Sequence, residues 1–211
     1  MDFITKLWKA DQTRITRFHT SDGKFCFNII DMSLSLGSTI LRHISGKLIE
    51  RPWFSLPAIR FLISKPIGNA IVFEYSTGMS TLWFTKHCKY IYSVENNNDW
   101  YDLITQKTST KKNCTINFEN EKKNYVNQIS LIGVKYFDII SIDGSYRLDC
   151  FLYARDYLKR GGLMIIDDTD AQYGKEIKKI LPKYFDIPKI ISFPGYSYGT
   201  FHPKETTICL S

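Results

Sequence analysis

From about residue 70 onward, short apolar runs rich in β-branched residues alternate with longer amphipathic stretches. This alternation is typical of strand–helix–strand units around a parallel sheet. It predicts strands at residues 70–75, 90–95, 114–119, 136–143 and 163–167. Helices are predicted at residues 78–88, 99–107, 148–159 and 175–181, with Arg160-Gly161-Gly162 as the stop signal of the third.

The two ends of the chain follow a different pattern. Residues 186–192 and 206–210 are predicted strands with no helix between them, so we expect an antiparallel hairpin joined by an aromatic loop at 193–204. Before the alternation begins, only a helix at 56–64 is predicted. A length of 211 residues suits one domain. The expected α/β fold is a mainly parallel seven-stranded sheet, with residues 66–211 as core and 1–65 as a cap or lid.

The charge and cysteine content narrow the functional class. The formal net charge is +7, but the basic residues are scattered and form no run typical of a nucleic-acid tail. Five cysteines without a C-x-x-C pair argue against a disulfide framework and a zinc site. The sequence has an acidic residue at position 2, which is atypical of a signal peptide, and no apolar stretch is long enough for a signal peptide or a membrane span. We therefore expect a cytoplasmic protein in a reducing compartment.

Acidic residues stand at the ends of the predicted strands. Glu74 closes the first strand before a turn of small residues, and Glu95 ends the next. Ligands of open α/β sheets bind beyond the carboxyl ends of the strands, where an acid can accept hydrogen bonds from ribose hydroxyls. A dinucleotide site would need G-x-G-x-x-G, whereas this turn has only Gly78. A phosphate-free cationic ligand, S-adenosylmethionine, suits these acids and Asp143 better.

The stretch Glu74-Tyr75-Ser76-Thr77-Gly78-Met79-Ser80 resembles the acid-x-Gly-x-Gly-x-Gly motif of class I S-adenosylmethionine-dependent methyltransferases, with serines in place of two glycines. Residues 51–62, 73–86, 93–101 and 138–147 are similar to a small bacterial and viral subgroup associated with glycan-building enzymes. The resemblance covers residues 50–211 and implies a Rossmann-like sheet. It also implies a cofactor site made of Glu74, Ser76, Thr77, Gly78, Ser80, Thr81, Glu95, Asn96, Glu119 and Asp143.

Within this implied site, the turn residues would surround the methionyl part of the cofactor. Glu95 would hold the ribose, and Asn96 and Glu119 would lie near the adenine. For Ser80 and Thr81 the alternative is a role in capping the helix.

Methyl transfer to an alcohol needs alignment and a proton acceptor. The catalytic candidates are Asp143, Asp168 and His202, with Asp170 and His43 as further bases. The acceptor-binding candidates are Trp53, Arg147, Asp170, Tyr196 and Tyr198. Asp143, Asp167 and Asp168 resemble the acids by which catechol-type methyltransferases hold Mg²⁺; the alternative is that they cap helices without a metal.

These observations predict an O-methyltransferase whose partner is a small-molecule or saccharide acceptor, with a sugar hydroxyl of a glycan or glycolipid intermediate as the site of methylation. Two alternatives remain open. The serines in the first motif suggest a catalytically silent domain that binds a nucleoside or a partner protein. The positive charge suggests a nucleic-acid methyltransferase, although the sequence has no Asn-Pro-Pro-Tyr-type motif for a flipped base.

Overall fold

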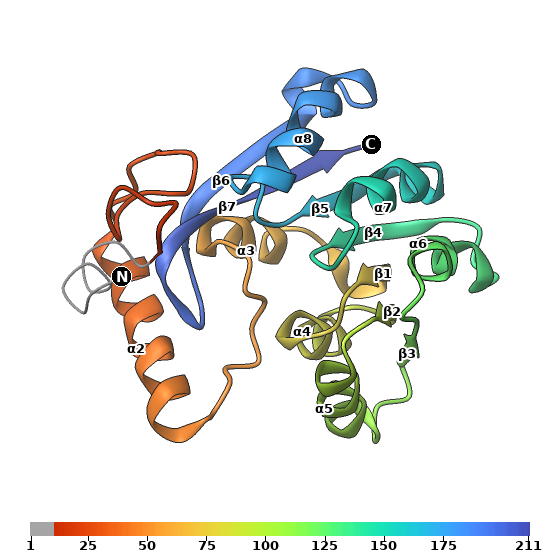
Figure 1. Cartoon of the computed structure of the whole chain (residues 1–211). Helices are drawn as coiled ribbons and strands as arrows, with labels where there is room; N and C mark the ends of the chain where they lie inside the picture. The colour runs from red at the N-terminus through yellow and green to blue at the C-terminus, as the bar shows by residue number, and fades with distance from the viewer. Residues whose placement is uncertain (1–10) are drawn as a thin grey trace.

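The structure, a computed structural model that describes residues 11–211, is built on one seven-stranded sheet with the strand order β3-β2-β1-β4-β5-β7-β6 (Figure 1). The strands are β1 (Ile71–Tyr75), β2 (Tyr90–Glu95), β3 (Cys114–Phe118), β4 (Phe137–Ile142), β5 (Leu158–Ile166), β6 (Ile190–Ser197) and β7 (Thr200–Leu210). Strands β1 to β5 are parallel, and β7 runs antiparallel to both β5 and β6. The predicted fold class, a mainly parallel sheet with a C-terminal antiparallel hairpin, is confirmed.

Helices cover both faces of the sheet. They are α2 (Ile29–Ser45), α3 (Leu56–Ile63), α4 (Met79–His87), α5 (Asn98–Thr108), α6 (Lys122–Leu131), α7 (Arg147–Ala154) and α8 (Gln172–Ile180). Helices α6, α7 and α8 pack on one face, and α3 and α4 pack on the other. Strand β1 is apolar from Ile71 to Phe73 because helices cover both of its faces. Val72 contributes to the α3/α4 core, and Phe73 contributes to the opposite core.

Two of the α-helices between residues 11 and 211 were not predicted. Helix α6 buries Tyr125, Val126 and Ile129, but its lysines and asparagines give it little amphipathic contrast. Helix α2 buries the polar residues Asp31, Ser35 and Ser38 and leaves apolar residues such as Ile30 and Ile44 exposed.

The helix predicted at residues 148–159 is present, but its predicted end and the stop signal at 160–162 were wrong. Helix α7 ends at Ala154, and β5 already begins at Leu158, so Gly161 and Gly162 lie within a strand. The pairing of β4 with β5 is irregular between Phe137 and Ile139, and Gly161 has a φ of 78°. An irregularity of this kind needs glycine for its backbone conformation, which in the sequence looks like a helix stop.

The hairpin is longer than expected, and the predicted aromatic loop at 193–204 is wrong. Strands β6 and β7 pair through most of it and turn tightly around Gly199, whose φ is 77°. Pro194 and Gly195 indicated a loop, but β6 is an edge strand, where proline is tolerated. A Cβ on Gly195 would lie 2.7 Å from Pro57, so the glycine allows α3 to approach the strand closely.

The N-terminal segment packs on this hairpin. In α2, the Ser35 hydroxyl donates to the carbonyl of Thr200 at 2.6 Å, and Arg42 donates to the carbonyl of Gly199 at 3.1 Å. The division into a cap at 1–65 and a core at 66–211 stays a prediction, and the first ten residues of that cap lie outside the described range. No helix between residues 11 and 211 combines the length and the apolar character that crossing a membrane requires.

Candidate functional site

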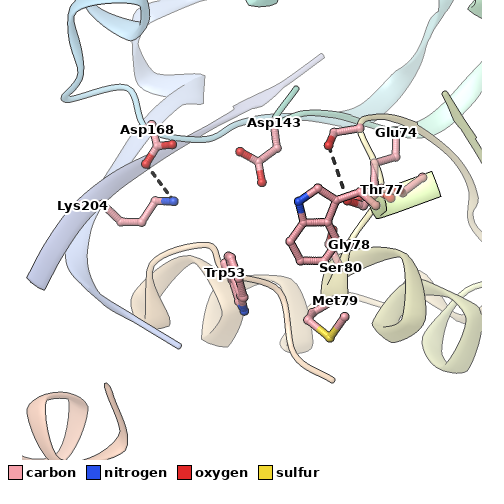
Figure 2. Close-up of a pocket in the computed structure, with 11 residues that line it drawn as sticks. Trp53, Glu74, Thr77, Gly78, Met79, Ser80, Asp143, Asp168 and Lys204 are labelled. Atoms are coloured by element: carbon pink, nitrogen blue, oxygen red, sulfur yellow. Dashed lines mark hydrogen bonds and ion pairs between the residues drawn. The ribbon is translucent and has the colours of Figure 1, made fainter. Parts of the chain in front are cut away.

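A cavity lies where the strand order changes direction, between the carboxyl ends of β1 and β4 (Figure 2). This is the position at which open α/β sheets bind ligands. The cavity has a volume of about 230 Å³. The lining residues are Trp53, Glu74, Ser76, Thr77, Gly78, Met79, Ser80, Trp100, Asp143, Asp168 and Lys204.

The turn between β1 and α4 accommodates its serine in a conformation that favours glycine. Ser76 has a φ of 87°, in the left-handed region. Its backbone N–H donates to the carbonyl of Val94 at 2.8 Å, and its hydroxyl donates to Glu95 Oε2 at 3.1 Å. These two bonds hold the strained residue in the left-handed conformation despite its side chain.

Glu74 is the acid at the floor of the cavity, and its side chain is only partly satisfied. The residue is 1% exposed. Oε2 accepts hydrogen bonds from the hydroxyls of Thr81 at 2.6 Å and Ser93 at 3.3 Å, while Oε1 has no partner among the described residues. Burial raises the pKa of Glu74 to about 8, although the hydroxyls of Ser80, Thr81 and Ser93 oppose the rise. A buried carboxyl oxygen that faces a cavity without a hydrogen-bond partner calls for a ligand with N–H groups, and an ammonium beside it would lower the raised pKa.

The Thr81 hydroxyl also accepts the backbone N–H of Gly78 at 2.9 Å, at the N-terminus of α4. Thr81 thus takes the capping role that was left open for it, and it does not line the cavity. Ser80 does line the cavity, beside Glu74.

Glu95 lies next to the cavity but does not line it. Its Oε2 accepts from the backbone N–H of Thr77 at 2.7 Å and from the Thr77 hydroxyl at 3.0 Å, besides Ser76. Its Oε1 accepts the backbone N–H groups of Asn96 and Asn97, both at 2.8 Å. The carboxylate therefore fixes the β1–α4 turn and the start of α5 to each other.

The two residues expected near the adenine occupy the same edge of the sheet. The Asn96 side chain pairs with the Ser145 hydroxyl at 3.0 Å, and the backbone N–H of Glu119 donates to the carbonyl of Glu95 at 2.9 Å. Neither residue lines the cavity. Their contacts with an adenosine, like that of Glu95 with its ribose, stay predictions.

On the other side of the cavity lie three acids, which we call the acidic cluster: Asp143, Asp167 and Asp168. One carboxylate oxygen from each lies within 4.8 Å of the other two. The ammonium of Lys204 forms ion pairs with Asp167 and, at 2.8 Å, with Asp168. The Arg147 guanidinium lies 3.2 Å from Asp143 and 3.4 Å from Asp168.

These residues do not fit Mg²⁺ as they stand. The ion requires oxygen ligands at about 2.0–2.1 Å in octahedral geometry. Here the ammonium of Lys204 lies between two of the three acids that would supply them. The expected magnesium site is therefore not supported.

The pKa values of two acids in the cluster, Asp143 and Asp168, are shifted in opposite directions. Burial alone would raise the pKa of Asp168, but Lys204 and Arg147 together hold it well below its usual range. Burial raises the pKa of Asp143, although Arg147 and Lys204 oppose the rise. Asp143 is thus the better proton acceptor of the two, and Asp168 mainly anchors the cations.

Two tryptophans form the aromatic part of the lining. Trp53 and Trp100 meet edge to face, with ring centroids 5.9 Å apart, and the Arg42 guanidinium stacks on Trp53 at 4.8 Å. Trp53 therefore stands at the cavity, where a lid or acceptor contact was expected. Arg147 does not line the cavity. Its guanidinium donates to the backbone carbonyls of Asp143 and Asp167 and so holds these two residues of the cluster together.

Other predicted residues lie elsewhere. His202 is on β7 outside the cavity, and burial and Arg14 lower its pKa to about 4. The Tyr196 hydroxyl donates to the carbonyl of Arg17 at 3.1 Å, within the core. Asp170 accepts the backbone N–H groups of Ser21 and Glu205 and so fastens the N-terminal segment to the sheet. Tyr198 and the exposed His43 do not line the cavity either.

Three lining residues were not predicted as site residues: Met79, Trp100 and Lys204. Trp100 was one of several aromatic residues compatible with either a pocket or a core. Lys204 was placed at the end of a loop, and only the full length of β7 brings it to the acidic cluster. A continuous strand from residue 200, had it been predicted, would have indicated this position.

No protein-family model matches the sequence, and neither does any curated protein. Solved structures do match it. The O-methyltransferase TomG from Streptomyces achromogenes, involved in tomaymycin synthesis and solved with S-adenosylmethionine, shares 12% identity and a TM-score of 0.60 over 85% of this chain and 88% of that one. An O-methyltransferase structure from Klebsiella pneumoniae shares 15% sequence identity with a TM-score of 0.57, and the match covers 86% of this chain and 98% of that one. A Streptococcus mutans methyltransferase in complex with S-adenosylhomocysteine shares 13% sequence identity with a TM-score of 0.54, and the match covers 72% of this chain and 94% of that one.

At these identities the matches establish the architecture of the chain. It has the Rossmann-like fold of S-adenosylmethionine-dependent methyltransferases. The resemblance to the glycan-associated subgroup stays a prediction.

Proposed function

We propose that the chain is an S-adenosylmethionine-dependent methyltransferase that methylates an oxygen atom of a small-molecule acceptor. The observation that carries this proposal is the unpartnered Oε1 of Glu74 at the floor of the cavity. S-adenosylmethionine brings an ammonium and a sulfonium and carries no phosphate, so it matches a site lined by Glu74, Asp143 and Asp168. The solved structures of the same fold support the choice, since two of those described above contain this cofactor or its demethylated product.

The residues of the β1–α4 turn would hold the methionyl part. Glu74 would accept a hydrogen bond from the ammonium, and Ser76, Thr77, Gly78 and Ser80 would surround it. Met79 and Trp100 offer apolar surface on the same side of the cavity. The chemistry supplied by the bound cofactor is an electrophilic methyl group, released as the S–C electron pair stays on sulfur.

On the acceptor side, the chain must remove the proton of the hydroxyl group and exclude water. Asp143 is placed for the first task because its carboxylate faces the cavity and its raised pKa favours taking up a proton (Figure 2). Arg147 fixes its position from behind. Trp53 would cover the acceptor. An aromatic face beside charged groups also suits a sugar ring, so we propose a sugar hydroxyl as the group that is methylated.

The cellular setting belongs to the same proposal. All five cysteines are free, which supports a reducing, intracellular compartment such as the cytoplasm.

Calorimetric titration with S-adenosylhomocysteine tests the cofactor assignment without knowledge of the acceptor. A hydrogen bond to a charged group is worth about 1.5–3 kcal/mol, so Glu74→Gln is expected to weaken binding by about 10- to 100-fold. Glu176→Gln, at an exposed position on α8, is the matched control and should bind like wild type. If wild type bound neither this ligand nor S-adenosylmethionine, the enzyme assignment would fail, and the alternative of a catalytically silent domain would take its place.

The acceptor class is tested by methyl transfer from labelled S-adenosylmethionine to a panel of free sugars, glycolipids, catechols, RNA and DNA. The proposal predicts label on a carbohydrate oxygen and a strong loss of transfer in Asp143→Asn. Label confined to nucleic acid would overturn the assignment of a small-molecule acceptor.

A further inference from the structure

Lys204 lies on β7 and contacts the acidic cluster from that strand. None of the sequence motifs that carry the family resemblance includes β7. The residue is 8% exposed and lines the cavity. Its ammonium forms an ion pair with Asp167 and a second one with Asp168, which Figure 2 shows. The Thr206 hydroxyl, two positions along the strand, donates to the other oxygen of Asp167 at 2.6 Å. Asp167 is thus held from two points of β7, and the ammonium has a fixed position.

The charges of the cluster explain why this position matters. Three carboxylates face two cations, Lys204 and Arg147, which leaves a net charge of −1. A divalent cation added to this set would meet the ammonium among the oxygens that it needs. Without the charge of Lys204 the net charge would be −2, which a divalent cation would neutralise.

The geometry of the ammonium also leaves a donor for a ligand. A lysine ammonium has three N–H bonds, and Lys204 has two ion-pair partners, Asp167 and Asp168. Lys204 lines the cavity together with Asp143, the proposed proton acceptor. The third N–H bond can therefore donate to an oxygen atom that lies between Lys204 and Asp143.

We propose that Lys204 is a built-in cation that takes the place of a divalent metal in this site and binds one oxygen of the acceptor. The inference rests on the proposed function for its acceptor part and on the acidic cluster alone for its metal part. A metal ion chelates two neighbouring oxygens, whereas an ammonium donor holds one. The site therefore selects acceptors by a single hydroxyl group and has no need of a vicinal diol.

The metal part is tested by titrating Mn²⁺ alone into wild type, Lys204→Met and Lys204→Gln, with the bound ion detected by electron paramagnetic resonance. We expect both variants to bind Mn²⁺ at least about tenfold more tightly than wild type, because each loses the competing charge. Lys179→Met, an exposed lysine on α8, is the control and should behave like wild type. Tight Mn²⁺ binding by wild type would overturn the inference, and so would folded Lys204 variants that bind no better than wild type.

The acceptor part is tested with the acceptor found in the labelled panel. Wild-type transfer is expected to be insensitive to EDTA. Lys204→Met should raise the acceptor KM about tenfold or more, with the affinity for S-adenosylhomocysteine unchanged within about twofold. An unchanged acceptor KM would remove Lys204 from this role. If S-adenosylhomocysteine did not bind wild type at all, the proposed function would fail while the Mn²⁺ titration still tested the cation.

Discussion

Glu74→Gln should make the unliganded protein more stable while it removes the proposed cofactor contact. The wild-type carboxyl is 1% exposed, and burial raises its pKa to about 8 from an ordinary value of 4.5. Between these two pH values the folded chain keeps the proton on Glu74 and the unfolded chain has lost it. The free energy of unfolding therefore falls as pH rises through this interval, because ionisation favours the unfolded state.

The size of the effect follows from the same two pKa values. Linkage changes the free energy of unfolding by about 1.4 kcal/mol per pH unit while the proton numbers differ by one. Glu74 should thus lower the stability of wild type by about 3 to 4 kcal/mol between about pH 5 and pH 8. Glutamine does not titrate, and its carbonyl oxygen can still accept the hydroxyls of Thr81 and Ser93. The variant should therefore escape this loss.

Urea denaturation of both proteins across that pH range measures the effect. Subtracting the wild-type free energy of unfolding from that of Glu74→Gln at each pH cancels the other titrating groups. The difference should increase steadily in favour of the variant and level off above about pH 8. A difference that does not change with pH would show that Glu74 titrates like a solvated carboxyl, and the argument from its burial would fail.

Two further substitutions test the scaffold of the site. Glu95→Gln should lower the free energy of unfolding by about 3 kcal/mol in chemical denaturation, because the carboxylate accepts five hydrogen bonds from the loops around the cavity; wild-type stability would contradict this role. Gly144→Ala places a Cβ 2.1 Å from the Tyr125 hydroxyl and 3.0 Å from Ser76, so thermal unfolding should show a loss of about 1–3 kcal/mol. Calorimetry should also show weaker binding of S-adenosylhomocysteine to Gly144→Ala, whereas unchanged stability and affinity would mean that the loop relaxes freely.

The parallel core could be predicted because its strands are buried on both faces. The run at residues 70–75 is apolar at every position except Glu74, which is typical of a parallel strand covered on both faces. The position of Glu74 followed directly, since a strand end before a turn of small residues fixes where a side chain meets the ligand edge. Local sequence was sufficient for these features because they depend on near neighbours in the chain.

The hairpin and its contribution to the site depend on contacts distant in sequence. Pro194 and Gly195 are compatible with a strand only because β6 is at the edge of the sheet and Pro57 packs against it. Lys204 reaches the acidic cluster through the pairing of β7 with β5, which joins residues about 40 positions apart. The cation that occupies the cluster was therefore not predicted, and the acids alone suggested a metal.

Glu95 shows a limit of a different kind. Its place at the end of a strand beside the site was predicted, but its partners are mainly backbone N–H groups of two turns. The Thr77 N–H group directly follows Ser76, whose left-handed conformation the sequence does not reveal at a non-glycine position.

The most direct test of the central claim is a crystal structure of the protein with S-adenosylhomocysteine bound. The account predicts the ligand in the cavity between β1 and β4, with its amino group within hydrogen-bonding distance of Glu74 Oε1. A ligand bound elsewhere, or one in this cavity that leaves Glu74 Oε1 without a donor, would contradict it.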